Sequence, residues 1–292
     1  MVASLAGGRW WSRRAALLVA CTATLSLVAS CARESHEDDH GEAATSPAHV
    51  HALAINPADD TLYVASHDGL FRVTGETGTE QVAGLTQDFM GFAIAGPDRF
   101  LGSGHPGPHD TDQPSHLGLI ESTDAGQTWH SLSLAGEVDF HALEVEHDRV
   151  YGYDSVSGTL MVSGDGKTWD RRARVGIADL AVSPEDAEHV VVTTEDGPAH
   201  STDGGRGFAP TSGGPVLAFL DWPSADRLVG VGTDGTVHHS ADGGRTWQPR
   251  GRVPSRPQAI TTHGESEVYV AAEDGIYHSA DDGGTFTLSR RL

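Results

Sequence analysis

The stretch SADGGRTW, from Ser240 to Trp247, recurs along the chain and decides its fold. Close copies are STDAGQTW (122–129), STDGGRGF (201–208), SADDGGTF (279–286) and the shorter SGDGKTW (163–169). Their leading serines are separated by 41, 38, 39 and 39 residues. A period of about 40 residues, with turn residues and an aromatic residue in each copy, predicts a β-propeller or a solenoid.

Each copy has the composition of a tight turn between two strands. The aspartate can accept hydrogen bonds from backbone N–H groups of its own turn, and glycine tolerates positive φ. The aromatic residue that follows would begin a strand and bury its ring between neighbouring sheets. We therefore expect a structural role for Ser122, Asp124, Gly126, Trp129, Asp165, Trp169, Ser201, Asp203, Ser240, Asp242, Gly244, Trp247, Ser279, Asp281 and Phe286.

Around these turns the chain divides into six units of four strands. Each unit opens with an apolar run, such as HALAI at 51–55, and continues with a β-rich run, such as TLYVA at 61–65. Asp-Gly pairs typical of hairpins follow in four units. In the first unit the repeated turn has degenerated to VTGETGTE at 73–80. The sequence predicts an all-β, six-bladed β-propeller of four-stranded antiparallel blades over residues 49–292, without a helix.

The first thirty residues have the pattern of an export signal. Arg9, Arg13 and Arg14 precede an apolar run at 15–30, which is short for a membrane span. The run ends in VASC at 28–31, a lipobox-like sequence that predicts cleavage before Cys31 and lipidation of its thiol. An uncleaved transmembrane anchor is the alternative, and Arg13-Arg14 also partly resembles a twin-arginine signal. Either alternative places the body outside the cytoplasm, attached to the membrane.

Loss of this segment would remove Cys21 and three arginines. The remaining chain would carry 16 basic and 41 acidic residues, a net charge of −25, with no disulfide and no cysteine nucleophile. Such a charge disfavours nucleic acid and favours cations or basic partners. Residues 31–48 are predicted to form an acidic flexible tether. We interpret His36 and His40 as spacer residues, although metal binding there is an alternative.

Alignment of the six first strands predicts which side chains line the central channel. One position is occupied by His51, Met90, His141, Ala178, Leu217 and Gln258. Two residues earlier, on the same strand face, lie His49, Asp88, Asp139, Gly176, Pro215 and Arg256. Polar residues with metal-ligating groups are thus concentrated in the first three units.

Units two and three also depart from the repeat. An insertion at 103–115 contains His105, His109, Asp110 and Asp112, and His116 follows it. In unit three, residues 154–158 replace the Asp-Gly turn. Because strands alternate in direction, the insertion and the start of each first strand are expected at the same face, and the repeated turns at the other. We expect the functional site at the face that carries the insertion and the altered turn, because the propeller scaffold needs neither of them.

The face that carries the insertion surrounds the entrance of the central channel, here called the mouth. The residue types predicted there suit a divalent transition metal. Imidazole binds zinc, copper, iron or nickel, and a methionine favours copper. The candidate ligands are His49, His51, Asp88, Met90, His105, Asp139 and His141. The alternative is that these histidines form hydrogen bonds with neighbouring carboxylates and that Met90 only packs.

The pattern S-x-D-x-G-x-T-W resembles the Asp-box, or BNR repeat. Together with HVHALAINP (49–57), DFMGF (88–92), GSGHPGP (102–108) and DFHAL (139–143), it resembles a group of bacterial lipoproteins known as glycosyl-hydrolase-like or sialidase-like β-propellers. The resemblance implies a lipid-anchored propeller. The repeat is a structural feature of the propeller, so it does not by itself imply the hydrolase activity in the family's name.

The label can be compared with the residues present. Sialidases use an arginine triad, a Tyr–Glu nucleophile pair and an aspartate, but Arg256 is the only arginine at the two channel positions. Tyr151 and Tyr153 are expected to pack within a sheet. Asp88 and Asp139 could still form a carboxylate pair for glycoside hydrolysis. Three functions therefore remain open: binding of a metal or small polar ligand, glycoside hydrolysis, and protein interaction as in the similar Asp-box assembly factors of photosystem biogenesis.

Overall fold

The computed structural model describes residues 46–75 and 78–292. The predicted signal segment at 1–30, the lipidation site Cys31 and the tether as far as residue 45 lie outside the described residues. Within those two ranges the chain forms strands and turns, and no helix there is long and apolar enough to cross a membrane.

The first three blades come from the N-terminal half of the described chain. Blade one comprises β1 (Val50–Asn56), β2 (Thr61–Ser66), β3 (Gly69–Thr74) and β4 (Gly78–Gln81). Blade two comprises β5 (Asp88–Gly96), β6 (Arg99–His105), β7 (Leu119–Ser122) and β8 (His130–Ser133). Blade three comprises β9 (Phe140–Glu146), β10 (Arg149–Asp154), β11 (Thr159–Ser163) and β12 (Asp170–Arg174).

The other three blades repeat this order. Blade four comprises β13 (Leu180–Val182), β14 (Val190–Thr194), β15 (Gly197–Ser201) and β16 (Ala209–Pro210). Blade five comprises β17 (Leu217–Ser224), β18 (Arg227–Gly232), β19 (Thr236–Ser240) and β20 (Gln248–Arg252). Blade six comprises β21 (Pro257–His263), β22 (Glu267–Ala272), β23 (Gly275–Ser279) and β24 (Thr287–Arg290).

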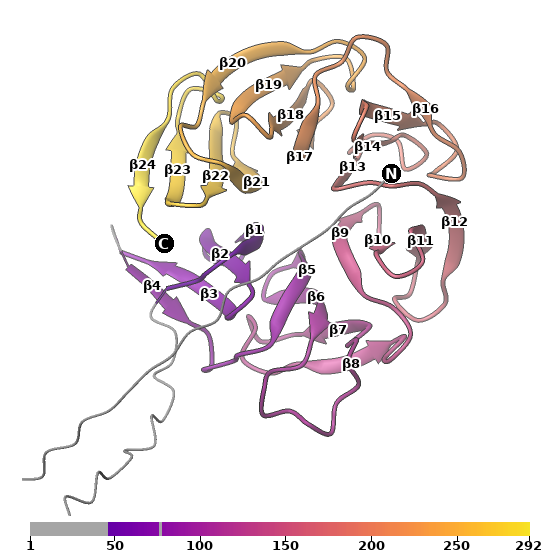
Figure 1. Ribbon diagram of the computed structural model, residues 1–292, viewed down its shortest axis with the longest axis vertical. Coiled ribbons are helices and arrows are strands. Elements are labelled where there is room, and N and C mark those ends of the chain that lie inside the picture. The colour runs from indigo at the N-terminus through magenta and orange to yellow at the C-terminus, as the bar shows by residue number, and fades with distance from the viewer. Residues whose placement is uncertain (1–45, 76–77) are drawn as a thin grey trace, which may run out of the picture. The chain divides into compact units, whose positions relative to one another are not determined.

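The six sheets are arranged in a ring, with the first strand of each blade nearest the centre (Figure 1). All pairings within the sheets are antiparallel and follow chain order, as in β1-β2-β3-β4. The six-bladed propeller predicted from the 40-residue period is therefore confirmed.

The core lies between neighbouring blades, because each sheet is covered on both faces. Aromatic side chains fill the space between blades one and two, where Tyr63 and Phe100 meet edge to face at 4.8 Å. Middle strands are buried on both sides, as in β18, where Leu228, Val229 and Val231 are all inaccessible. This explains why the second runs of the repeats read as continuous apolar stretches.

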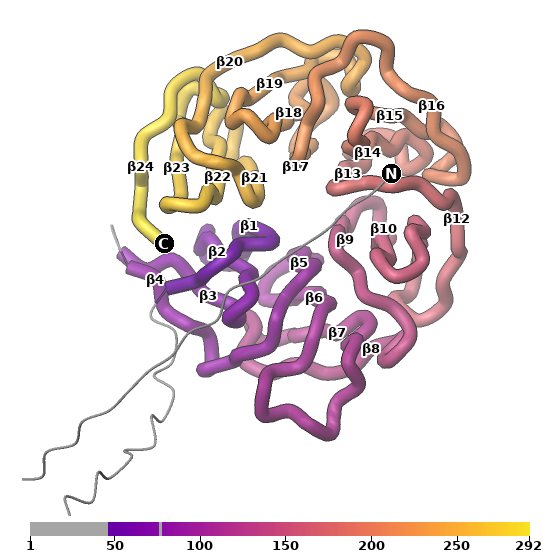
Figure 2. The backbone as a smooth tube through the Cα atoms, viewed as in Figure 1, coloured from indigo at the N-terminus to yellow at the C-terminus, as the bar shows by residue number. Residues whose placement is uncertain are grey.

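Blade six closes the ring against blade one without sharing a strand. The backbone N–H of Val50 donates to Oε1 of Gln258 at 3.0 Å, and Leu53 and Phe71 pack in one cluster with Ile276. The end of the outer strand β24 lies beside the outer strand β4 of blade one, as the backbone trace in Figure 2 shows. There, Nη1 of Arg290 donates to the carbonyl of Gly78 at 2.9 Å.

The repeated turns satisfy their polar groups internally. In the copy at 240–247, Oγ of Ser240 donates to Oδ1 of Asp242 at 2.8 Å and accepts from the N–H of Gly244 at 2.8 Å. The same carboxylate accepts from both the N–H and the hydroxyl of Thr246, at 2.8 and 2.7 Å. Gly244 has φ of 84°, and Nε1 of Trp247 donates to its carbonyl at 2.9 Å.

Substitution of Asp242 by alanine should destabilise the protein by about 1–2 kcal/mol, because it removes the acceptor of three hydrogen bonds and leaves donors unsatisfied. Asp112, an exposed carboxylate in the β6–β7 loop, supplies the matched control. Its replacement by alanine should change stability by less than about 0.5 kcal/mol. Urea unfolding followed by tryptophan fluorescence measures both, and equal effects would contradict this role of the turn.

Candidate functional site

The inner strands of the first three blades carry an extra residue where they begin. The register of β1 shifts between Val50 and Ala52, which leaves His51 without a cross-strand partner. Met90 in β5 and His141 in β9 occupy the same unpaired position. Such β-bulges bend a strand and re-aim the extra side chain. Bulges therefore present two imidazoles and a thioether at the start of the first three blades.

Blade five departs from the predicted alignment by one residue. Its register shifts between Leu217 and Phe219, so Ala218 occupies the bulge position assigned to Leu217, and Val216 replaces Pro215. Sequence comparison missed this because either alignment places apolar residues there. The concentration of polar residues in blades one to three is unaffected.

One group of polar side chains, here called the Asp88 cluster, comprises His51, His67 and Asp88. Nδ1 of His67 lies 3.0 Å from Oδ2 of Asp88, and Nε2 of His51 lies 3.7 Å from Oδ1. One ligand atom from each residue falls within 4.8 Å of the others. His67 is the open side of this cluster, since its side chain is 64% exposed. This spacing fits the coordination sphere of one metal ion.

A second group, here called the Asp139 cluster, comprises His105, His116, Asp139 and His141. Oδ2 of Asp139 lies 2.8 Å from Nε2 of His141, 3.6 Å from Nε2 of His105 and 4.0 Å from Nδ1 of His116. The side chain of Asp139 is only 5% exposed, whereas His105 and His141 are 36% and 37% exposed. A buried carboxylate is thus surrounded by three imidazoles that reach solvent.

Both clusters contain buried polar atoms without a hydrogen-bond partner in the described residues. These atoms are Nε2 of His51, Oδ1 of Asp88, Nδ1 of His116 and Oδ1 of Asp139. Buried polar atoms are nearly always paired, because a bare one costs about 1–3 kcal/mol. Two nitrogens and two carboxylate oxygens in this state at one mouth are a donor set that a cation would satisfy.

The pKa shifts of the mouth residues determine which of them can bind a cation at neutral pH. Burial, assisted by the neighbouring His49 and His67, lowers the pKa of His51 to about 4, so its imidazole is neutral. Burial raises the pKa of Asp88, and the charge of His67 offsets part of that rise. Burial also acts to raise the pKa of Asp139, but the hydrogen bond from His141 and the nearby imidazoles lower it below its usual value.

The other predicted ligands lie around these clusters. His49 packs edge-on against His51, with ring centroids 4.8 Å apart. His49, His51, Met90 and His141 line one cavity of about 250 Å³. In the β6–β7 loop, by contrast, His109, Asp110 and Asp112 are exposed and belong to neither cluster.

His67 was missed in the sequence although a signal was present. It lies in the turn between β2 and β3, directly before Asp68 and Gly69, at the same face as the start of β1. His105 proves to be the last residue of β6 rather than part of a free loop. Its Nδ1 lies 2.7 Å from the carbonyl of Ser115, a contact that holds the β6–β7 loop beside the mouth.

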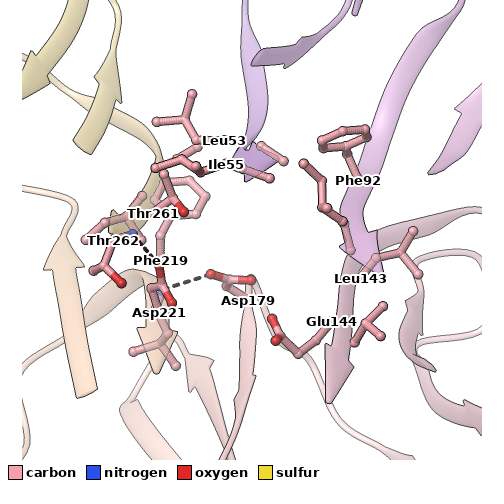
Figure 3. A pocket seen from close by; sticks show the side chains of 18 of the residues that line it. Leu53, Ile55, Phe92, Leu143, Glu144, Asp179, Phe219, Asp221, Thr261 and Thr262 are labelled. Atoms are coloured by element: carbon pink, nitrogen blue, oxygen red, sulfur yellow. Dashed lines mark hydrogen bonds between the residues drawn. The ribbon is translucent and has the colours of Figure 1, made fainter. Parts of the chain in front are cut away.

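The central channel holds a second polar group, which the sequence analysis also missed. Glu144, Asp179 and Asp221 face a cavity of about 410 Å³ (Figure 3). Oδ2 of Asp179 accepts from the N–H of Leu220 at 2.8 Å, and Oδ2 of Asp221 accepts from the N–H of Thr262 at 2.5 Å. Each of these two carboxylates thus ties its blade to the inner strand of the next one.

Asp179 should make stability fall as the pH rises. Burial raises its pKa from 3.8 to about 7, against the two backbone hydrogen bonds it accepts, and Asp221 adds to the rise. The protonated form is favoured in the folded state, so this stabilisation is present below about pH 4 and is lost through pH 7. The same cavity is lined by Glu144, Asp60, His51, His141 and His263.

A rise of this size corresponds to about 4 kcal/mol, and water in the channel screens part of it, so we expect roughly 2 kcal/mol. Urea unfolding between pH 5 and pH 8 should therefore show Asp179→Asn gaining stability relative to the unmodified protein as the pH rises. Asp196→Asn, at an exposed turn, should not change the slope. If the stability of Asp179→Asn changed with pH in the same way as that of the unmodified protein, this would contradict the raised pKa of Asp179.

Fold and mouth together define a six-bladed β-propeller with an imidazole–carboxylate site at one end of its channel. No family model matches the chain, and a search of curated proteins finds no match. Among solved structures, a GH74 xyloglucanase from Xanthomonas campestris is similar at 18% identity and a TM-score of 0.54, over 84% of this chain and 38% of that chain.

YCF48 from Cyanidioschyzon merolae is similar at 13% identity and a TM-score of 0.57, over 81% of this chain and 96% of that chain. A structure of YCF48 bound to D1 peptide gives 13% identity and a TM-score of 0.58. The chain spans less than half of the xyloglucanase. At these identities the similarities establish the propeller fold.

Proposed function

We propose that this protein is a lipid-anchored, extracytoplasmic β-propeller that binds a divalent transition metal at the Asp139 cluster. The observation that carries the proposal is the buried Asp139, whose Oδ1 has no hydrogen-bond partner and whose Oδ2 lies 4.0 Å from an equally unpartnered Nδ1 of His116. A network held only by hydrogen bonds between histidine and carboxylate would leave neither atom bare. A metal ion accepts electron pairs from both.

The composition of the cluster supports zinc or copper as the ion. Three imidazoles are ligands of intermediate softness, which suit zinc, copper and nickel better than magnesium or calcium. Zinc also accepts a carboxylate oxygen beside imidazole nitrogens. Met90 lines the same cavity as His141 and offers a thioether there. His105 and His141 reach solvent, so an ion there can exchange or accept an external ligand.

The proposed location is supported by the N-terminal sequence. The arginine-containing segment, the apolar run at 15–30 and the VASC sequence support export and attachment through Cys31. The described chain begins at residue 46 and enters β1 at Val50, on the mouth side of blade one. The net negative charge of the chain favours cations over anions as ligands.

Metal uptake by the purified chain tests the proposal. The metal-free protein should take up zinc and copper, with affinities measured by competition against a chromophoric chelator. His109→Ala, which removes an exposed imidazole of the same loop, should bind normally. No stoichiometric uptake of any of zinc, copper, nickel or iron would overturn the proposal.

Glycoside hydrolysis by Asp88 and Asp139 is a second candidate, favoured by the opposite directions in which their pKa values shift. General acid and base catalysis uses a pair of carboxyl groups, one with a raised pKa and one with a lowered pKa. The burial of Asp139 argues against it, because a base must reach a water molecule. Hydrolysis of a glycan panel that is lost in both Asp88→Asn and Asp139→Asn, without added metal, would favour this candidate.

A further inference from the structure

We propose that the mouth holds two divalent ions side by side, one at the Asp139 cluster and a second at the Asp88 cluster. This inference rests on the proposed metal-binding function and extends it from one ion to a pair. It follows from the contacts of the two clusters, which share no residue but adjoin in space.

The ligand atoms of each cluster lie close enough together to share one ion. Nitrogen and oxygen ligands lie about 2.0–2.2 Å from zinc, so the ligand atoms of one ion are at most about 4.4 Å apart. The ligand atoms of His51, His67 and Asp88 fall within 4.8 Å of one another, and so do those of His105, His116 and Asp139. Small side-chain rotations would bring either set onto an ion.

Each cluster also has its own unsatisfied pair of atoms. In the Asp88 cluster these are Nε2 of His51 and Oδ1 of Asp88, and in the Asp139 cluster they are Nδ1 of His116 and Oδ1 of Asp139. One ion in the Asp139 cluster would leave the first pair bare. Two ions satisfy all four atoms.

The clusters are neighbours because two adjacent strands join them. Asp88 of one cluster and His105 of the other are cross-strand partners in the β5–β6 pair. Partner Cα atoms in antiparallel strands lie about 4.5–5.5 Å apart. The charges of His105, His141 and Asp139 reach Asp88, and those of His141 and Asp139 reach His51. Ions in the two clusters would therefore interact.

The two positions should differ in affinity. The Asp139 cluster offers three imidazoles and a buried carboxylate, whereas the Asp88 cluster offers two imidazoles, one of them 64% exposed on His67. The second ion also enters beside an ion already bound, whose charge repels it. We expect the Asp139 cluster to fill first and the Asp88 cluster to fill at higher metal concentration.

Stoichiometry in paired variants tests this inference. The full chain, stripped of metal and titrated with zinc, should bind two equivalents by elemental analysis after buffer exchange. His51→Ala/His67→Ala should keep one tight equivalent, His105→Ala/His116→Ala should keep one weaker equivalent, and His109→Ala should keep two. Circular dichroism and unfolding midpoints identify any variant that has lost its fold.

A measurement on the unmodified chain makes the test independent of folding in variants. With two equivalents of Cu²⁺, electron paramagnetic resonance should show dipolar broadening and a half-field transition from a coupled pair. One equivalent that both double variants abolish would mean a single shared ion, and would overturn the inference while the proposed function stands. No uptake at all would overturn the proposed function as well.

Discussion

Exchange of Asp139 for asparagine is expected to weaken zinc binding at the mouth by about 100-fold. Asparagine keeps the shape of the side chain and can still accept from Nε2 of His141, now 2.8 Å from the carboxylate. It loses the negative charge, and an NH2 group that cannot bind a metal ion replaces the oxygen that has no hydrogen-bond partner in Asp139. Loss of partners that only orient a ligand already costs 10–100-fold, so loss of the ligand itself should reach about 100-fold.

Asp110→Asn is the matched control, because Asp110 is an exposed carboxylate of the β6–β7 loop outside both clusters. It should leave zinc affinity within about a factor of two. Competition titration with a chromophoric chelator measures both variants at one pH. Equal affinities for the Asp139→Asn and Asp110→Asn proteins would show that Asp139 does not bind the ion.

Replacement of Phe140 by alanine should destabilise the protein by about 3–5 kcal/mol, the cost of emptying a well-packed aromatic site. The side chain is fully buried, and its ring lies 5.0 Å from that of Trp169. A Cβ on Gly152 would come within 2.6 Å of the same ring, so the space is closely filled. In the sequence Phe140 lies between Asp139 and His141, so its buried ring fixes the backbone that carries both of these side chains.

Guanidinium unfolding followed by fluorescence measures this loss, with Leu288→Ala as the control. Leu288 is 38% exposed on β24, so its truncation should cost less than about 0.5 kcal/mol. Phe140 packs in one cluster with Leu101 and Leu119 of blade two and Met161 of blade three. A loss below about 1 kcal/mol for Phe140→Ala would contradict close packing at this junction.

The fold was largely predictable because the same four-strand pattern recurs about every 40 residues along the sequence. Six copies of one strand pattern cannot bury their faces alone, and each copy supplies turn residues that set the strand ends. The serine, aspartate, glycine and tryptophan of the 240–247 turn interact within eight residues of one another, so local sequence contains all the information needed. The ring closure by blade six follows from the same repeat.

The site was predictable only in part, because its geometry depends on register and on turns from different blades. His51, Asp88, Asp139 and His141 were identified from two positions of an alignment. His67 was missed because it lies in a turn that looks like an ordinary hairpin. Its proximity to Asp88 arises only when blades one and two are neighbours in the ring.

The channel carboxylates were missed for another reason. Asp179 and Asp221 bond to backbone N–H groups of the next blade, about 41 residues further along the chain. Their neighbours Leu180, Leu220 and Trp222 are apolar, and the pattern therefore indicated buried strands. Only the three-dimensional arrangement shows that the carboxylates face a common cavity.

Anomalous diffraction from crystals of the zinc-loaded chain would locate a metal ion at the mouth. We expect an anomalous peak beside the carboxylate of Asp139, with imidazole nitrogens of His105, His116 or His141 at about 2.0–2.2 Å from it. A mouth without an anomalous peak in crystals that contain zinc at saturating concentration would show that the Asp139 cluster does not bind the ion.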